Sequence, residues 1–443
     1  MNSMLDETHD AAATSWVDSA QAAGADFPLQ NLPLGVFRPR PGDAAPRVGA
    51  AIGDFAFDLA AAFAAGLLGA DCEPLAAACA QPTLNALISL GSGVRAALRR
   101  RIFALLRADA PASQRRSAEC HLHRRSEIEM LLPAAAGDYT DFYASIHHAI
   151  RVGQLFRPDH PLLPNYKWVP IGYHGRSSSL LPSGAKIRRP CGQSAPPAGD
   201  PNAAPLVGPS RRLDYELELG FFVAGGNRVG ESIPIAAAGD HIFGVCLLND
   251  WSARDIQAWE YQPLGPFLGK NFATTLSPWV VTWEALAPFR APAFPRPPAD
   301  PAPLPYLHDA ADQASGALDI TVEAYLATAA MAAAGTPPQR LSRGNAKELY
   351  WTPAQMLAHH ASNGCPLRAG DLLATGTISG AAPESAGCLL ELTSAGRAPI
   401  TLCSGETRQF LADGDEVILR AYCERPGFRR LGWGECRGQI TSC

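Results

Sequence analysis

Hydrophobic and polar residues alternate over short stretches near the start of the chain. Val48–Ile52 is an apolar run, Gly53-Asp54 is a turn former, and Phe55–Leu59 alternates. Short runs of this kind, bounded by turn residues, predict β-strands. The residues before position 16 show no such pattern, and we expect 1–15 to be a disordered tail.

The pattern changes to helical spacing over residues 59–107. Apolar residues recur at intervals of four, four and three and so form one helix face: Val94, Leu98, Ile102 and Leu105. Five arginines surround this face: Arg95, Arg99, Arg100, Arg101 and Arg107. A basic helix can bind phosphate or nucleic acid, but this pattern favours an ordinary solvated face.

From about residue 131 onward, short strands with turn residues between them predict a β-rich domain. Residues 192–210 are rich in Pro, Ala and Gly, and residues 288–305 contain eight prolines in 18 positions. Such density excludes regular structure and predicts extended surface loops. The fold class is therefore expected to be mainly β with some α, with one domain over residues 16–130 and a second over 131–443.

The composition of the 443-residue chain excludes several classes of protein. Its 37 basic and 42 acidic residues give a net charge of −5, which argues against a nucleic-acid binder. The longest apolar run, Leu59 to Ala70, has 12 residues, short of the roughly 18 that a membrane span needs. We therefore expect neither nucleic-acid nor membrane association.

The N-terminal charge and the cysteines indicate the compartment. The first 25 residues contain no Lys or Arg, so they lack the basic segment of a signal peptide. The 11 cysteines are scattered and form no CxxC motif, which favours reduced thiols in a cytoplasmic enzyme. Cys120-His121-Leu122-His123 superficially suggests zinc, but without a second cluster at zinc-like spacing a loop is favoured.

An alternating acidic run is the strongest local signal for chemistry. In Leu213–Leu219, a strand would place Asp214, Glu216 and Glu218 on one face. A solvated edge strand explains this run if it is taken alone. Asp141 and Asp250 change the picture, because carboxylates from three segments would form an oxygen-only site suited to Ca²⁺ or Mg²⁺.

The segment after Asp250 predicts a short polar helix. Ser252 and Asp255 have the spacing of a capping box, which would start the helix there. Arg254, Gln257 and Tyr261 then share one face, suited to binding an oxyanion or carboxylate, although a plain surface helix is the alternative.

Three further residues are candidates. Lys270 follows Gly269 in a turn that lacks the rest of a phosphate-binding loop. His148 lies shortly after Asp141, although a lone histidine is more often a packed or surface residue than a base. Glu391 lies within a short apolar run, expected to be a strand, and a buried carboxylate needs a partner such as a catalytic histidine.

The runs that hold these residues resemble the fumarylacetoacetase family of C–C bond hydrolases. The resemblance extends from about residue 16 to the C-terminus. The matching runs are Phe27–Pro33, Asp138–Tyr143, Gly172–Arg176, Leu213–Glu218, Asn249–Ile256, Pro263–Lys270 and Gly376–Gly380.

The resemblance implies a fold and an assembly. The N-terminal domain, residues 16–130, would be a small SH3-like barrel, and residues 131–443 would form a large β-sandwich roll in a homodimer. The Ca²⁺ ligands it implies are Asp141, Glu216, Glu218 and Asp250. It further implies a Mg²⁺ site at Asp250, Thr274 and the backbone carbonyl of Lys270, because an ammonium group cannot ligate a metal.

The resemblance also implies catalytic roles. His148 would accept a proton with Glu391 orienting it, while Arg254 and Lys270 would stabilise negative charge. The implied substrate contacts are Tyr143, Arg157, Gln257, Tyr261 and Thr377. The substrate would be a diketo dicarboxylic acid, cleaved to fumarate and acetoacetate in the last step of tyrosine and phenylalanine degradation.

Two alternatives stay open at this point. One is a sister enzyme with the same metal site: an acylpyruvate hydrolase, or a 2-oxo acid decarboxylase or isomerase. The matched N-terminal run argues against it. The other is a non-enzymatic metal-binding protein, which the simultaneous presence of His148, Glu391, Arg254 and Lys270 disfavours.

Overall fold

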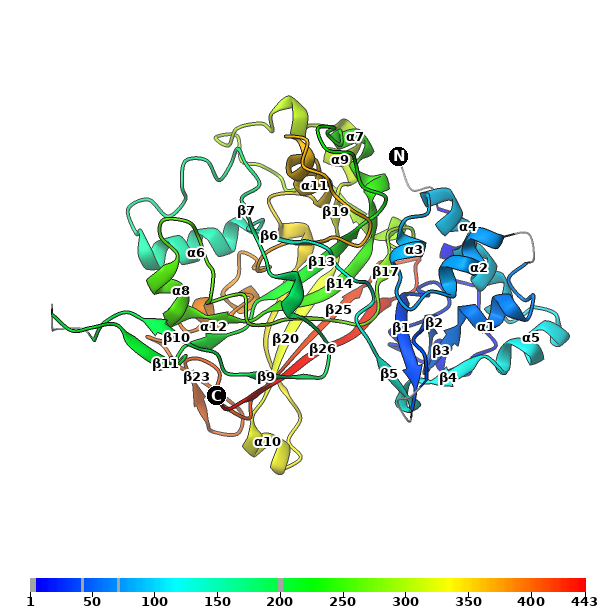
Figure 1. Cartoon of the computed structure of the whole chain (residues 1–443), viewed down its shortest axis with the longest axis horizontal. Coiled ribbons are helices and arrows are strands. Elements are labelled where there is room, and N and C mark those ends of the chain that lie inside the picture. Colours follow the sequence, from blue (N-terminus) through cyan, green and yellow to red (C-terminus); the bar gives the residue numbers. More distant parts are fainter. Residues whose placement is uncertain (1–4, 41–43, 70–71, 198–201) are drawn as a thin grey trace.

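The computed structural model describes residues 5–40, 44–69, 72–197 and 202–443 and shows a small N-terminal domain beside a larger one (Figure 1). The small domain contains an antiparallel sheet of order β4-β3-β2-β1-β5. Its strands are β1 (Leu34–Pro39), β2 (Arg47–Ile52), β3 (Phe55–Asp58), β4 (Leu122–Arg124) and β5 (Ile128–Met130). The strands predicted around Gly53-Asp54 are therefore confirmed, while the SH3-like barrel stays a prediction.

The small domain also contains helices: α1 (Leu59–Ala64), α2 (Glu73–Cys79), α3 (Asn85–Ile88), α4 (Ser92–Leu106) and α5 (Ala112–Glu119). Of these, α1 and α2 contact β2 of the sheet. The predicted helix is α4, and its Leu98 and Ile102 are buried as expected. The solvated basic face was wrong in part, because Arg95 and Arg99 are also buried. Arg99 donates to the carbonyls of Gln30 and Asn31, so it ties the helix to the preceding loop.

The N-terminal segment is not a disordered tail over its described part. Glu7–His9 forms a 3-10 helix with a capping box from Asp6. The hydroxyl of Thr8 accepts from Nε of Arg99 at 3.0 Å, and Nε2 of His9 lies 3.0 Å from the carbonyl oxygen of Glu284. Residues 5–15 therefore contact both domains, and the first four residues lie outside the described part of the chain.

The large domain is built from two curled sheets. The first has the order β7-β6-β22-β13-β14-β16-β8, with β17 also pairing β14. Its strands are β6 (Tyr139–Phe142), β7 (Gly172–His174), β8 (Leu180–Pro182), β13 (Leu217–Val223), β14 (Ile242–Asp250), β16 (Thr274–Leu276), β17 (Val281–Thr282) and β22 (Leu372–Ala374). β13 and β14 are buried along their whole length, so they form the centre of the core.

The second sheet has the order β21-β20-β25-β26-β9. Its strands are β9 (Ala185–Arg188), β20 (Thr321–Ala327), β21 (Gln339–Asn345), β25 (Glu416–Cys423) and β26 (Leu431–Thr441). The two sheets share a core, in which the indole N–H of Trp433 donates to the carbonyl of Val245 at 2.8 Å. The chain is thus a mixed α/β fold with its cores in curled sheets.

Helices and two-stranded ribbons complete the large domain. Two of the ribbons have strands within residues 192–210 and 288–305, so the expectation that these segments lack regular structure was wrong in part. The helices are α6 (Ile146–Phe156), α7 (Ile235–Ala238), α8 (Arg254–Glu260), α9 (Ala310–Ser315), α10 (Ala329–Ala333), α11 (Pro353–Ala361) and α12 (Leu389–Leu392). The ribbons pair β10 (Cys191–Ser194) with β11 (Leu206–Pro209), β12 (Leu213–Asp214) with β15 (Ser252–Ala253), β18 (Arg290–Ala291) with β19 (Ala317–Leu318), and β23 (Ile400–Thr401) with β24 (Thr407–Arg408). Within the described ranges, no helix combines the length and apolarity needed to cross a bilayer.

The expectation that all thiols are reduced was wrong for one pair. Cys191 and Cys443 form a disulfide, while the other nine cysteines are free. The parallel pairing of β9 with β26 places Thr441 beside Arg188, so the residues that follow each strand meet. The disulfide joins residues 252 positions apart in the sequence. Local sequence patterns do not reveal contacts of this range.

Candidate active site and metal centre

Four acidic side chains meet at one end of the eight-stranded sheet. Asp141 lies on β6, Glu216 directly precedes β13, Glu218 lies on β13, and Asp250 ends β14. β6 pairs with β22, and β13 lies between β22 and β14. Oxygen atoms of the four carboxylates lie within 4.8 Å of one another, and all four residues are buried. The structure thus brings together carboxylates from three separate segments, and we call them the acidic cluster.

The acidic run is not the continuous strand that the alternation predicted. β12 ends at Asp214 and β13 begins at Leu217, so Tyr215 and Glu216 interrupt the strand. The amide of Glu216 donates to the side-chain oxygen of Asn249 on β14 at 3.1 Å, instead of to a backbone carbonyl of a neighbouring strand. The solvated edge strand is also excluded, because Asp214, Glu216 and Glu218 are all buried.

The electrostatics of the acidic cluster favour a bound cation. Burial, followed by repulsion from Asp250, raises the pKa of Asp141 well above its usual range. Burial and the nearby Asp141 carboxylate likewise raise the pKa of Glu218. Among the described residues, Oδ1 of Asp141 and Oε1 of Glu218 are buried without a hydrogen-bond partner. Unpaired oxygens in an all-oxygen donor set fit a hard divalent cation.

Lys270 and Thr274 contact the acidic cluster through their side chains. The ammonium of Lys270 donates to Oδ2 of Asp250 at 2.9 Å and also to Glu216, while the hydroxyl of Thr274 donates to Oδ1 of Asp250 at 2.9 Å. Burial lowers the pKa of Lys270, but Asp250 and Glu216 outweigh it and hold that pKa above its usual range. Burial raises the pKa of Glu216, and the Lys270 and Arg254 cations then hold it below its usual range.

Tyr173 is a member of this site that the sequence did not single out. The hydroxyl of this half-buried residue lies 2.9 Å from Oδ2 of Asp141 and 2.7 Å from Oδ2 of Asp250. Tyr173 is on β7, whose pairing with β6 places it opposite Asp141. The signal that could have found it is its place in the run Gly172–Arg176, which matched the family without an assigned role.

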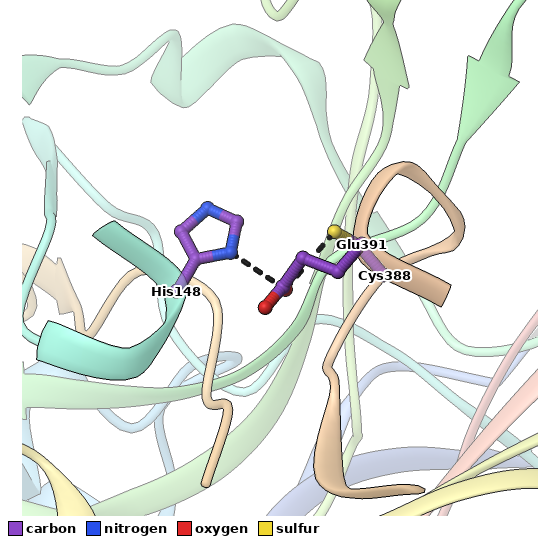
Figure 2. Close-up of side chains that lie close together, drawn as sticks. All are labelled: His148, Cys388 and Glu391. Carbon is purple, nitrogen blue, oxygen red and sulfur yellow. Dashed lines mark hydrogen bonds and ion pairs between the residues drawn. The ribbon is translucent and has the colours of Figure 1, made fainter. Parts of the chain in front are cut away.

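A histidine and a carboxylate form a second buried group, shown in Figure 2. Nδ1 of His148, on α6, lies 2.7 Å from Oε2 of Glu391. Burial raises the pKa of Glu391, but the contact with His148 and its hydrogen bonds lower it to about 2. The ionised carboxylate accepts the Nδ1 proton, so in a neutral imidazole Nε2 would carry the lone pair of a base. We call His148 and Glu391 the dyad.

The environment of Glu391 differs from the predicted strand. It lies on the one-turn helix α12, which begins directly after Cys388. The Cys388 thiol donates to Oε2 of Glu391 at 3.3 Å, and the Ser379 hydroxyl donates to the same oxygen at 2.8 Å. Burial and the Glu391 charge raise the pKa of Cys388 well above its usual range. Cys388 is therefore a neutral hydrogen-bond donor rather than a thiolate ligand.

Arg254 connects the dyad region to the acidic cluster. Its Nε donates to Oδ2 of Asp214 at 2.9 Å, and its Nη1 lies 2.8 Å from Oε1 of Glu216. Asp214 also accepts from the backbone amides of Leu389 and Leu390 at the start of α12. Asp214 therefore orients both Arg254 and the helix that carries Glu391. The sequence placed it on the acidic face but assigned it no role.

The predicted helix after Asp250 is confirmed, but its capping box was wrong. α8 begins at Arg254 after Ala253, without a side-chain cap. Ser252 belongs to β15, and Asp255 accepts from Ser210 and Arg211 instead. The strand ladder that holds Ser252 therefore overrides its capping tendency.

The implied substrate contacts fall into two groups. Tyr143 packs edge-on against His148 with ring centroids 5.2 Å apart, and Gln257 lies 3.2 Å from Nη1 of Arg254. Thr377 is buried, and its hydroxyl has no partner among the described residues. Arg157 caps the end of α6, and Tyr261 follows α8 and is 38% exposed. For these last two, the described side-chain hydrogen bonds are with Pro161 and Gln262 and not with the site.

The chain matches two models of known protein families. Residues 139–441 match the family model described as fumarylacetoacetate hydrolase C-terminal, and residues 30–133 match the model described as fumarylacetoacetase N-terminal. The chain belongs to the fumarylacetoacetase family. It is accordingly a hydrolase with an acidic site for a divalent metal.

Individual relatives agree over nearly the whole chain. The chain is 48% identical to human fumarylacetoacetase over 95% of its length and 97% of that protein. It is 47% identical to the Oryza sativa fumarylacetoacetase, with 95% of each chain covered. The solved fumarylacetoacetate hydrolase from Exiguobacterium antarcticum is 16% identical with a TM-score of 0.50, covering 93% of this chain and 100% of that one. That likeness supports the fold alone.

Proposed function

We propose that the protein hydrolyses a C–C bond of 4-fumarylacetoacetate to give fumarate and acetoacetate, the last step of tyrosine and phenylalanine degradation, in the cytoplasm. One observation carries the proposal: a buried histidine–carboxylate dyad is linked through Arg254 and Asp214 to an all-oxygen acidic cluster. Relatives that are 47–48% identical over 95% of the chain are named fumarylacetoacetase, which supports this substrate.

His148 is the proposed base. With Nδ1–H held by Glu391 at 2.7 Å, Nε2 is the atom that accepts a proton from the attacking water. Glu391 fixes the tautomer and stabilises the imidazolium that results. General-base catalysis of this kind contributes roughly 10²- to 10⁴-fold in rate.

The acidic cluster is the proposed metal site. Ca²⁺ would be held by Asp141, Glu216, Glu218 and Asp250, whose oxygens converge. Mg²⁺ would be held by Asp250, Thr274 and the backbone carbonyl of Lys270. A bound divalent cation would polarise the carbonyl group of a diketone substrate.

Polar groups between the two sites would receive the developing negative charge. Arg254, Gln257 and Lys270 are donors that the surrounding structure already orients. Donors of this kind contribute on the order of 3 kcal/mol each when they are preorganised around an oxyanion. The same groups would stabilise the leaving acetoacetate carbanion before it is protonated.

The ends of the substrate need separate recognition. Tyr143 and Arg157 are the proposed readers of a carboxylate, because a guanidinium makes strong charge-assisted bonds to it. Tyr261 and Thr377 would be neutral donors to the other end, and the unpartnered Thr377 hydroxyl suits this role. Arg157→Leu should therefore penalise fumarylacetoacetate more than a diketone without the fumaryl carboxylate, by about 1.5–3 kcal/mol. An equal loss on both substrates would assign Arg157 a structural role.

A homodimer is the proposed assembly. Exposed apolar side chains follow α8 closely in sequence, and Leu264 is 96% and Phe267 66% exposed. The ribbon β10–β11 contacts α8 and carries the exposed Val207. Apolar exposure of this kind marks contact surfaces. Analytical ultracentrifugation of the wild type and of Leu264→Asp/Phe267→Asp tests the proposal, which predicts a shift from dimer to monomer.

The function is tested by comparing substrates. Purified protein with Ca²⁺ or Mg²⁺ should turn over fumarylacetoacetate faster than acylpyruvates, with fumarate and acetoacetate identified by proton NMR. Chelation with EDTA should abolish turnover, and either cation should restore it. Faster turnover of acylpyruvates, or activity insensitive to chelation, would overturn the proposal.

A further inference from the structure

The N-cap of α6 and one face of the helix carry three polar residues at intervals of three, which are Ser145, His148 and Arg151. Ser145 caps the helix by accepting from the backbone amide of His148 at 3.2 Å. Its hydroxyl donates to the carbonyl of Ser379 at 2.9 Å. Arg151 follows His148 by three residues, so its side chain leaves the same face one turn later. The helix that carries His148, the proposed base, therefore has a polar anchoring residue one turn before His148 and another one turn after it.

Arg151 completes the hydrogen bonding of Glu391. The carboxylate oxygen Oε2 accepts from His148, Ser379 and Cys388. The other oxygen, Oε1, accepts from Nη1 of Arg151 at 3.2 Å, the one contact recorded for it in the described part of the chain. The Glu391 side chain is 0% exposed. Without Arg151, a buried carboxylate oxygen would lose its partner and could turn away from the imidazole.

Arg151 also organises the loop that precedes α12. Its Nη2 lies 2.8, 3.0 and 2.9 Å from the carbonyl oxygens of Gly380, Ala381 and Ala382. Three successive carbonyls pointing to one place repel one another unless a cation lies between them. The same loop begins with Ser379, which bonds Glu391, so the guanidinium holds two supports of the dyad at once.

We propose that Arg151 is a positioning residue of the hydrolytic site, holding Glu391 and the 379–382 loop so that His148 keeps the orientation of a base. This role rests on the proposed function. Arg151 touches no reacting atom in this scheme. It does not read a substrate carboxylate either, because both of its terminal nitrogens already bind acceptors within the chain.

The first experiment separates kcat from KM. Arg151→Met should lower kcat for fumarylacetoacetate about 10-fold through a misplaced dyad, with KM within about twofold of wild type. Arg151→Lys keeps a cation near Glu391 and should recover most of the loss. In a Glu391→Gln background, Arg151→Met should have little further effect, because both changes act through one unit. Equal losses in both backgrounds, or a rise in KM alone, would overturn the proposal.

Arg408 provides a matched control. It also binds a buried carboxylate, that of Asp415 at 2.9 Å, and a backbone carbonyl, and it belongs to β24, outside the site. Arg408→Met should leave kcat unchanged. A matching loss of kcat in this variant would mean that any lost guanidinium slows the enzyme, and would overturn the specific role of Arg151.

A spectroscopic measurement tests the proposal even if Arg151→Met does not fold. This measurement does not depend on turnover. The hydrogen-bonded Nδ1 proton of His148 should give a low-field proton resonance, identified by its loss in His148→Ala. The milder Arg151→Gln should shift or broaden this resonance, whereas Arg408→Met should not. An unchanged resonance in Arg151→Gln would overturn the proposal. Absence of fumarylacetoacetate turnover in wild type would instead contradict the proposed function.

Discussion

The acidic cluster and the dyad both bury carboxylates, but their charges are balanced differently. In the cluster, Asp141 and Glu218 each keep an oxygen without a partner in the described structure, and burial raises their pKa values. In the dyad, both oxygens of Glu391 have partners and its pKa falls to about 2. The cluster is therefore arranged to receive a cation, whereas the dyad is complete without one. A buried acidic group indicates a ligand only where its hydrogen bonding is unfinished.

The largest effect should come from the dyad and should leave the cluster untouched. His148→Ala removes the base and no ligand, so kcat should fall by roughly 10²- to 10⁴-fold. Metal affinity, measured by isothermal titration calorimetry, should stay that of wild type. More than about a tenth of the wild-type kcat would contradict the role of His148 as base.

The second effect reverses this comparison. Glu216→Gln or Asp250→Asn removes charge from the proposed ligand set, so affinity for Ca²⁺ and Mg²⁺ should fall. A loss of about 10- to 100-fold is expected, as for other changes around metal ligands. Activity should recover in part at high metal concentration, because the dyad is intact. Calorimetric titration that shows unchanged affinity would return these carboxylates to a structural role.

The sequence predicted the features that depend on neighbouring residues and missed those that depend on contacts between distant segments. The alternation over Leu213–Leu219 and the helix after Asp250 were predictable in outline, because such patterns are local. Glu391 was placed on a strand, since a short apolar run does not distinguish a strand from one helical turn. The capping tendency of Ser252 lost to strand pairing with Asp214.

The contacts that the sequence missed join distant segments. Arg99 binds Gln30, Arg151 binds the 380–382 loop, and Cys191 pairs with Cys443. Each depends on how strands and helices assemble, which no local pattern records. The family resemblance supplied the roles of Arg157 and Tyr261, which the described contacts do not yet connect to the site.

In the absence of metal, removing a carboxylate charge should change the free energy of unfolding in opposite directions at the two sites. At a pH high enough to ionise Glu218, Glu218→Gln removes one of several mutually repelling buried charges and should raise the free energy of unfolding in EDTA. Glu391→Gln places amide protons among the donors His148, Ser379 and Cys388 and should lower it. Changes of about 1–3 kcal/mol are expected for each, measured by urea unfolding. Added Ca²⁺ should stabilise wild type more than Glu218→Gln, and changes of the same sign in both variants would contradict the comparison.

The smallest effect is the pH dependence of stability, which also has opposite signs in the two sites. Folding raises the pKa values of Asp141 and Glu218 above their unfolded values of about 4. Their stabilisation is therefore complete below about pH 4 and is lost as pH rises through the folded pKa values. The pKa of Glu391 is lowered to about 2, so its stabilisation is present above about pH 4.3 and is lost as pH falls.

In EDTA, the Tm of wild type should therefore fall as pH rises from about 5 to 8, a window above the unfolded pKa values of the two raised carboxyls. Glu218→Gln should weaken this slope because one raised group is gone, whereas Glu391→Gln should leave it unchanged, since Glu391 is ionised throughout this window. Saturating Ca²⁺ should flatten or reverse the slope, because a cation stabilises the ionised carboxylates. Calorimetric scans of the three proteins with and without Ca²⁺ measure all of these effects. A wild-type Tm that rises with pH in EDTA would mean that the acidic cluster is already neutralised by the Lys270 and Arg254 cations, and the contrast between the two sites would fail.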